Sequence, residues 1–401
     1  MNKPAEPFAI STARSHFPAL ERWTYMDVAG RSVLSREVRA AIDAHLDDRM
    51  YNGATNKEHF FDLIENGRSR FAELINADPD EVTYAKNISE GLNIVATGLD
   101  WRAGDNVVLC PELEHPNNVY PWLNLRDRYG IEVRMVPARD GHITVEDLVK
   151  HIDARTRVVT LSEVTFAPGF RLDIDAVGRA CRERDVLLLV DGAQSIGFVH
   201  TDVRASNIDA IAASTQKGLL ALYGMGFVYI RREWAERMRP VYLARFGVDL
   251  GADAHEASIG SYDYELAAGA RRFDVGNYNF VATAAANKSM EQLLGWGTRN
   301  IETHLAHLSH TLARGFIELG LPVAGGPPGR HLAQIVTVGV MSANHYGTGD
   351  ERYNRLYAHL VENRVKLSVR RGMLRFSLHV YNNMDDVERV LELTREFLKR
   401  G

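Results

Sequence analysis

The sequence predicts an α/β protein in which a mainly parallel sheet is flanked by helices and followed by a smaller α+β domain. Through most of the chain, short apolar runs alternate with helical patterns. These runs are continuously apolar, as expected for parallel strands that are buried on both faces. Strands separated by helices of this length form right-handed βαβ units. After about residue 280 the pattern changes to long helices followed by short strands.

The central part contains four strands and three helices in alternation. The expected strands are NVVLC (106–110), IEVRMVP (131–137), RVVTLSEV (157–164) and VLLLVDGA (186–193). The helical patterns cover residues 117–130, 145–153 and 173–185. Gly130 is expected to end the first helix, and Asp173 or Asp175 is expected to cap the third.

The last part of the chain is expected to form a separate, smaller domain. Helices are expected at 285–297, 300–320 and 385–400, with short strands IVTVGV, RVKLSV and MLRFSL between the second and the third. We therefore predict a large domain over residues 21–280 and a small domain over 281–401. Residues 1–20 are a candidate addition to the small domain.

The composition narrows the class of protein. The chain has 401 residues, a formal net charge of −5 and no basic stripe, so nucleic acid is not an expected partner. It has no apolar run of eighteen residues and no secretory signal at its start, which predicts a cytoplasmic protein without a membrane span. Cys110 and Cys181 lie far apart, in neither a disulfide framework nor a metal-site spacing, and no metal is expected.

An aspartate and a lysine mark the expected site of chemistry. Asp191 ends a buried strand at the carboxyl edge of the sheet, where α/β proteins bind ligands. Lys217 ends the run ASTQK and is followed by apolar and glycine-rich sequence. A lysine in apolar surroundings has a lowered pKa or is used covalently, and both suit Schiff-base formation. The alternative is that Asp191 caps a turn and that Lys217 extends from a helix to solvent.

The segments DGAQSIG (191–197) and STQKG (214–218) favour the first interpretation. Together they resemble the class V aminotransferase family of fold type I pyridoxal-phosphate (PLP) enzymes. That family includes cysteine desulfurases, selenocysteine lyases, kynureninases and isopenicillin N epimerases. The resemblance extends from about residue 24 to the end of the chain. It implies a sheet of the seven-stranded type and PLP held as a Schiff base on Lys217.

The resemblance also implies a set of cofactor contacts. Asp191 would pair with the protonated pyridine nitrogen, Gln194 would bond the phenolic oxygen, and His115 in ELEHPNNVYPW would stack on the ring and assist proton transfer. The other expected cofactor contacts are Ser89, the adjacent Glu90, Ser214 and Gln216, all in segments similar to the phosphate-binding segments of the family. A helix starting near Ser89 would favour a dianionic phosphate.

Two further matches concern the substrate and the assembly. Arg375 in MLRFSLHVYNN resembles the arginine that binds the substrate α-carboxylate, and its planar fork suits a carboxylate. The segment ARRFDVGNYNF is similar to the one that reaches the phosphate of a neighbouring subunit, with Asn277 at the contacting position. The resemblance therefore implies a homodimer with its site at the subunit interface.

Two departures from the family pattern bear on the reaction. Cysteine desulfurases carry a nucleophilic cysteine on a loop before the arginine strand, and this chain has no cysteine between Gln334 and Arg375. Glu163 stands where desulfurases usually have asparagine near the phenolic oxygen, so we include it among the cofactor contacts without assigning it an acid or base role.

The expected function is PLP-dependent chemistry on an α-amino acid or amino-acid conjugate. The substrate would form an external aldimine, with Lys217 as general base at Cα and His115 and Asp191 as the other catalytic residues. A lyase or epimerase reaction without persulfide is narrowly favoured, and a class V aminotransferase is the alternative. A nicotinamide dehydrogenase is disfavoured because no G-x-G-x-x-G follows the first strand of a βαβ unit. A PLP- or effector-binding module is the alternative outside enzymes.

Overall fold

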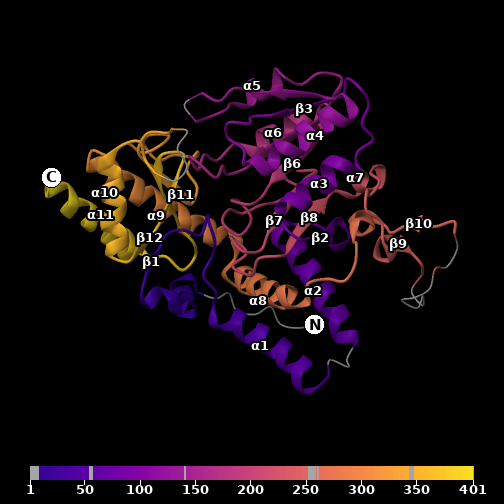
Figure 1. Ribbon diagram of the computed structural model, residues 1–401, viewed down its shortest axis with the longest axis horizontal. Helices are drawn as coiled ribbons and strands as arrows, with labels where there is room; N and C mark the ends of the chain where they lie inside the picture. Colours follow the sequence, from indigo (N-terminus) through magenta and orange to yellow (C-terminus); the bar gives the residue numbers. More distant parts are fainter. Residues whose placement is uncertain are drawn as a thin grey trace.

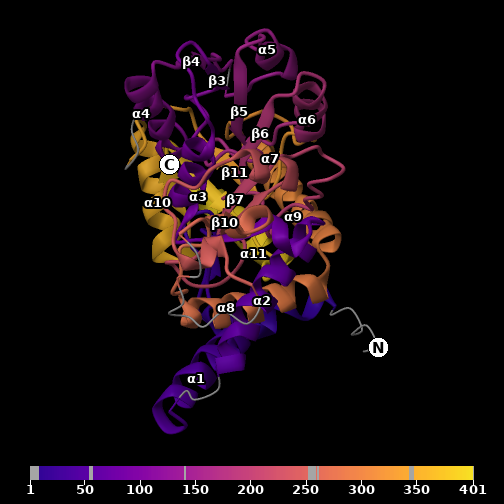
Figure 2. The ribbon, with the colours of Figure 1, turned by 90° about the vertical axis from the view of Figure 1, so that its right-hand side faces the viewer.

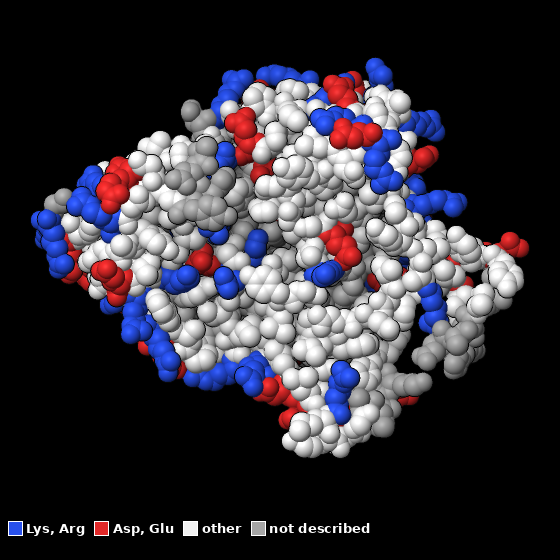
Figure 3. Space-filling view, viewed as in Figure 1, with Lys and Arg blue, Asp and Glu red and all other residues white. Residues whose placement is uncertain are grey.

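A computed structural model describes residues 9–53, 57–139, 141–251, 259, 262–342 and 347–400 of the chain. Figure 1 shows a large lobe built around a central sheet, and a second lobe that contains the carboxyl-terminal helices. Within the described ranges, no helix is both long and apolar enough to cross a membrane. On the face drawn in Figure 3, basic and acidic side chains are interspersed.

The large lobe contains a seven-stranded sheet in the order β2-β8-β7-β6-β5-β3-β4. Adjacent strands from β7 to β4 run parallel, whereas β8 is antiparallel to both of its neighbours. The strands are β2 (Val82–Ala85), β3 (Asn106–Leu109), β4 (Glu132–Met135), β5 (Thr156–Ser162), β6 (Leu187–Asp191), β7 (Ala210–Ser214) and β8 (Gly226–Ile230). The predicted mainly parallel sheet with flanking helices is confirmed.

Helices bury both faces of this sheet. One apolar layer joins Leu187 and Leu189 of β6 to α3 (Ile88–Gly98), α4 (Tyr120–Tyr129) and α7 (Arg232–Arg237). The other joins Leu188 and Val190 to α2 (Lys57–Ile75), α6 (Ile174–Arg182) and α8 (Phe280–Trp296). Successive residues of β6 thus face opposite apolar layers, which is why its sequence is apolar without interruption. The short helix α5 (Val145–Val149) precedes β5.

The second lobe is built on a three-stranded antiparallel sheet in the order β11-β14-β13. Its elements are α9 (Thr298–Glu318), β11 (Ile335–Val338), α10 (Glu351–Glu362), β12 (Val365–Lys366), β13 (Ser368–Arg370), β14 (Met373–Ser377) and α11 (Met384–Lys399). Residues 335–338 and 373–377 pair directly, which places Arg375 opposite Thr337. Arg375 is thereby held in the middle strand of the sheet.

The start of the described chain lies against this second lobe. The strand β1 (Thr24–Tyr25) pairs in parallel with β12. Arg14 forms an ion pair of 2.7 Å with Asp386 of α11, and the rings of Phe17 and Tyr381 are 4.9 Å apart. These contacts join the first described residues to the second lobe. The predicted boundaries at residues 20 and 280 stay predictions.

Helix α1 and a hairpin extend the large lobe. Helix α1 (Arg36–Tyr51) packs on α8, and its end projects from the body of the molecule in Figure 2. The short strands β9 (Val248–Asp249) and β10 (Glu265–Leu266) pair antiparallel at the edge that Figure 1 shows on the right.

Candidate active site

Asp191 and Lys217 come together at the carboxyl edge of the central sheet. Asp191 is the last residue of β6, and Lys217 follows three residues after β7 ends at Ser214. The two strands are parallel neighbours, with Asp191 opposite Ala212. The electrostatic effect of Asp191 raises the pKa of Lys217, so the two charged groups are within interaction range. The strand order therefore places both residues where open α/β sheets bind ligands.

The surroundings of Lys217 favour the neutral form of its amine. Burial lowers its pKa from 10.5 to about 8, and the guanidinium groups of Arg375 and Arg370 act in the same direction, while Asp191 opposes them. A neutral amine is the form that attacks a carbonyl or accepts a proton. Near neutral pH, Lys217 consequently carries a larger neutral, nucleophilic fraction than an ordinary lysine does.

The carboxylate of Asp191 is buried, so a cationic partner would stabilise its charge. Its side chain is 3% exposed, and Oδ1 accepts a hydrogen bond of 2.9 Å from the backbone N–H of Ala193. Burial raises its pKa, while this hydrogen bond and the charge of Lys217 lower it. A protonated ring nitrogen would provide a further counter-charge, which fits the role that the sequence predicts for Asp191.

Buried polar atoms without partners surround this pair in a way that fits PLP. Among the described residues, the hydroxyl of Ser214 and Oε1 of Gln194 are buried and have no hydrogen-bond partner. Nε2 of Gln194 donates to the carbonyl of Ala29 at 3.0 Å. Ser89 lies in the first turn of α3, where the N–H groups at the start of a helix favour an anion. Gln216 is half-buried beside Lys217. This donor set suits a phosphate and a phenolic oxygen.

Neither the backbone N–H nor the carboxylate of Glu90 is free to contact a phosphate. Its backbone N–H donates to Oδ1 of Asn87 at 3.0 Å, and its carboxylate accepts a hydrogen bond from the backbone N–H of Lys86. These bonds complete the start of α3. A carboxylate there would also repel a phosphate, so we leave Glu90 out of the proposed cofactor contacts.

His115 is exposed and lies within electrostatic range of Lys217. Its Nδ1 accepts a hydrogen bond of 3.2 Å from the backbone N–H of Asn117, and its ring meets that of Phe166 edge-on at 5.5 Å. Partial burial, followed by the charges of Lys217 and Arg370, lowers its pKa. The lowered pKa favours the neutral imidazole, and the ring is close enough to Lys217 for the charge of that residue to affect it.

Arg375 reaches the site from the second lobe. It is 2% exposed, and its Nε donates to the hydroxyl of Ser368 while Nη1 donates to the carbonyl of Phe166 at 3.0 Å. Its Nη2 is 3.5 Å from Oδ1 of Asp27 and makes no hydrogen bond with the described residues. Burial lowers its pKa to about 10. A guanidinium held on two sides with one nitrogen unsatisfied is suited to a carboxylate.

Three residues near this site were not predicted. Arg370 affects the pKa values of Lys217, His115 and Arg375, and it lies on the same strand face as Ser368, which pairs with Arg375. Asp27 neutralises part of the charge of Arg375.

The carboxyl group of Glu114 accepts hydrogen bonds from Asn118 and Ser162. Burial, followed by the charge of Asp191, raises the pKa of Glu114 to about 7. The only sequence signal for Glu114 is its position beside His115.

Glu163 and Asn277 lie apart from this group. Ser162 is opposite Asp191 in the sheet, and Glu163, one residue further, forms an ion pair of 3.7 Å with Arg171. Lys217 is not among the charges that affect Glu163, so we leave it out of the proposed cofactor contacts as well. Asn277 is exposed in the segment between Phe273 and α8.

The fold and this site define a PLP enzyme of fold type I. The model of the family "Aminotransferase class-V" matches residues 24–390. The chain therefore belongs to the class V aminotransferase family, and PLP is its cofactor.

Individual relatives carry different activity names. A "Probable cysteine desulfurase" of Methanothermobacter thermautotrophicus is 36% identical over 240 residues, which cover 57% of this chain and 58% of that protein. An "Uncharacterized aminotransferase YcbU" of Bacillus subtilis is 28% identical over 94% of this chain and 95% of its own. A structure of the cystine C-S lyase C-DES with its reaction product cysteine persulfide is 25% identical, with a TM-score of 0.82 over 94% of this chain and 99% of that one.

Proposed function

We propose that the enzyme acts on a free α-amino acid, or a conjugate of one, whose amino group replaces Lys217 on the cofactor. The observation that carries this proposal is that Lys217 lies within interaction range of both Asp191, at the edge of the central sheet, and Arg375, from the second lobe. When bound, PLP would supply an electron-withdrawing ring that stabilises negative charge at Cα. Lys217, Asp191, Gln194, Ser214, Gln216, Ser89 and His115 are the residues that would hold it.

The protein groups divide the remaining work between orientation and proton transfer. Arg375 would hold the α-carboxylate from the side of the second lobe, which fixes the bond at Cα that is to be broken. Lys217, with a pKa near 8, would take the proton from Cα. Asp191 would keep the ring nitrogen protonated, and His115 would contact the ring and assist proton transfer.

Arg375→Lys is expected to lower kcat/KM by about tenfold to a hundredfold. The substitution keeps the charge but removes the planar fork, and a charged hydrogen bond is worth about 1.5–3 kcal/mol. Steady-state kinetics on the enzyme's amino acid substrate provide the measurement. The matched control Arg352→Lys, at an exposed position on α10, should be neutral. Better turnover of amines that lack a carboxylate would contradict the role of Arg375.

For the later steps we propose a lyase- or epimerase-type outcome that does not use a protein persulfide. Cys110 is 1% exposed beyond β3, and Cys181 is fully buried in α6. Burial raises the pKa of Cys110 to about 11 and that of Cys181 to about 12, so both remain thiols near neutral pH. The sequence between β11 and Arg375 contains no thiol.

Transamination is the second candidate, because a relative that matches 94% of the chain carries an aminotransferase name. Elimination, epimerisation and transamination can be told apart by their products. Elimination at Cβ releases a 2-oxo acid and ammonia without an amino acceptor, and epimerisation returns the amino acid with inverted Cα. Continued turnover that depends on an added 2-oxo acid would instead establish transamination. A screen of amino acids with these three readouts tests the proposal.

The double variant Cys110→Ser, Cys181→Ser is expected to retain activity within about threefold, since neither thiol enters the chemistry. Burying each hydroxyl costs about 1–3 kcal/mol, so Cys110→Ala, Cys181→Ala is the second form to assay. Turnover is measured on the substrate that the screen identifies. Loss of turnover in folded protein with its cofactor spectrum intact, together with a trapped persulfide in the wild type, would show that a thiol participates.

We further propose that the enzyme is a homodimer. Exposed apolar side chains support this: Val241, Tyr242, Phe246, Tyr264 and Val275, the last of which precedes Asn277 by two residues. Met50 and Tyr51 are also exposed, each at 73%, at the projecting end of α1 (Figure 2). Exposed apolar patches of this kind mark association surfaces. Light scattering should give the mass of two chains, and the mass of one chain would contradict the proposal.

A further inference from the structure

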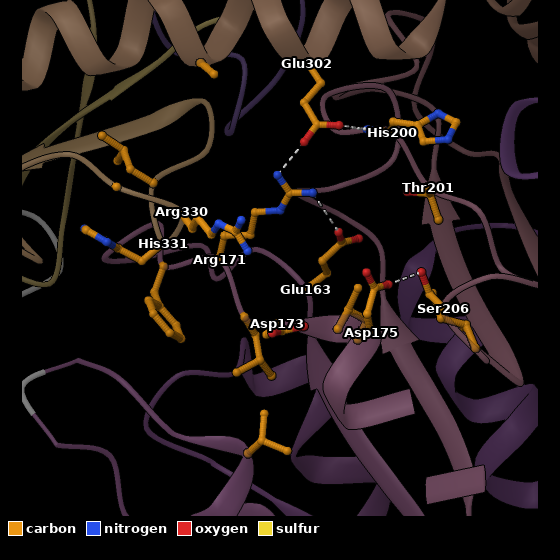
Figure 4. A pocket seen from close by; sticks show the side chains of 18 of the residues that line it. Glu163, Arg171, Asp173, Asp175, His200, Thr201, Ser206, Glu302, Arg330 and His331 are labelled. Atoms are coloured by element: carbon orange, nitrogen blue, oxygen red, sulfur yellow. Dashed lines mark hydrogen bonds and ion pairs between the residues drawn. The ribbon is translucent and has the colours of Figure 1, made fainter. Parts of the chain in front are cut away.

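A cavity of about 840 Å³ lies between the large lobe and α9 (Figure 4). Its walls come from the start of α6, the segment 200–208 after β6, helix α9 and residues 329–332 before β11. Lys217, Asp191, His115 and Arg375 do not line it. The cavity is therefore distinct from the candidate active site.

The two walls of this cavity carry different charges. The wall from the large lobe contains the carboxylates of Glu146, Glu163, Asp173, Asp175 and Asp202. The wall from the second lobe contains Arg299, Arg330, His310 and His331, together with Glu302. Arg299 and Arg330 are exposed, and neither has an ion pair with any of the described residues. Both guanidinium groups are thus available to an anion.

One arginine bridges the two walls. Arg171 forms ion pairs with Glu302 of α9 at 2.5 Å and with Glu163 at 3.7 Å, and Figure 4 shows the three side chains in a row. The second oxygen of Glu163, Oε2, is buried and without a partner among the described residues, as is the hydroxyl of Thr201. The two side chains are 2% and 5% exposed. An unsatisfied buried polar group destabilises the folded protein, and a ligand that donates to Glu163 would offset this cost.

We propose that this cavity is a second binding site, and that it takes a small zwitterion of the free amino acid class. The ammonium would lie at Oε2 of Glu163, and the carboxylate would lie at Arg299 and Arg330. Arg299 is in the first turn of α9, a 21-residue helix whose start has no side-chain cap, so the N–H groups there also favour the carboxylate. A ligand with both charges matches both walls, whereas one with a single sign of charge is opposed by one of them.

The site is linked to the active site by one short hairpin, residues 163–171. Its ends are closed by a bridge between Val164 and Arg171 and by a hydrogen bond of 2.9 Å from Thr165 N–H to the carbonyl of Phe170. Glu163 and Arg171 face the cavity, while the carbonyl of Phe166 accepts the hydrogen bond of Arg375. A ligand that shifts this hairpin changes the position of Arg375, and we expect it to change the KM for substrate.

The test is calorimetric titration of the borohydride-reduced holoenzyme, in which the probe's amine cannot attach to the cofactor. The probes are 4-aminobutanoate, succinate and 1,4-diaminobutane, which share four carbons but differ in charge. We expect 4-aminobutanoate to bind with a Kd of about 0.1–1 mM, and the other two at least about tenfold more weakly. Equal binding of all three, or no heat from 4-aminobutanoate up to about 10 mM, would overturn the proposal.

Variants locate the binding. Glu163→Gln and Arg330→Ala are each expected to weaken 4-aminobutanoate at least about tenfold, because each removes one charged contact. The control Arg314→Ala, an exposed residue of α9 outside the cavity, should leave the Kd unchanged. In the unreduced enzyme, 4-aminobutanoate should alter the KM for substrate in the wild type and not in Arg330→Ala. Unchanged binding in both site variants would refute the assignment, whatever the reaction at Lys217 proves to be.

Discussion

Lys217→Ala is expected to lower turnover by at least about a thousandfold. The substitution removes both the amine that would carry the cofactor and the base with a lowered pKa at Cα, and a positioned general base contributes about 10²–10⁴-fold by itself. The variant should still bind PLP noncovalently, because Ser89, Ser214 and Gln194 remain. Single-turnover kinetics after mixing with substrate measure the loss.

A matched control separates this effect from a general loss of positive charge. Lys288 on α8 forms an ion pair of 2.7 Å with Glu291 at the surface, so Lys288→Ala should retain activity. Turnover of Lys217→Ala within tenfold of the wild type would show that another group serves as the base.

Asp191→Ala is expected to slow removal of the Cα proton by about 10²–10⁴-fold, because a buried counter-charge for the ring nitrogen is lost. The folded state should lose only about 1 kcal/mol, since the side chain makes one hydrogen bond, with the N–H of Ala193. Exchange of the Cα proton in deuterated water, followed by nuclear magnetic resonance, measures this step directly. Asp191→Glu, which keeps the charge, should recover part of the rate. Near-wild-type exchange in Asp191→Ala would be incompatible with the proposed role.

Much of the fold follows from the apolar pattern, and the exceptions have a physical reason. The runs at 106–110 and 186–193 contain β3 and β6, and the run at 157–164 overlaps β5, because strands buried on both faces need apolar side chains throughout. The direction of β8 could not be predicted, since a continuous apolar run such as GFVYI reads the same in either direction. β2 has only four residues and gives no pattern of its own.

The site was predictable where it depends on strand ends, and less so where it depends on the second lobe. Asp191 and Lys217 follow neighbouring parallel strands, so their proximity comes from topology. Glu163 shows the limit of that reasoning. Ser162 is the residue opposite Asp191, and a shift of one residue along a strand turns the next side chain to the other face. The position of Arg370 beside Lys217 depends on the pairing of β13 with β14, which the sequence does not specify.

The central claim is that Lys217 carries the cofactor, and borohydride reduction of the purified holoenzyme tests it most directly. Reduction converts a Schiff base into a stable secondary amine, which peptide mass spectrometry can locate. We predict a pyridoxyl phosphate group on the peptide that contains STQKG, at Lys217, with loss of the visible cofactor absorption. A modified peptide that contains a different lysine, or reduction that leaves Lys217 unmodified, would contradict the account.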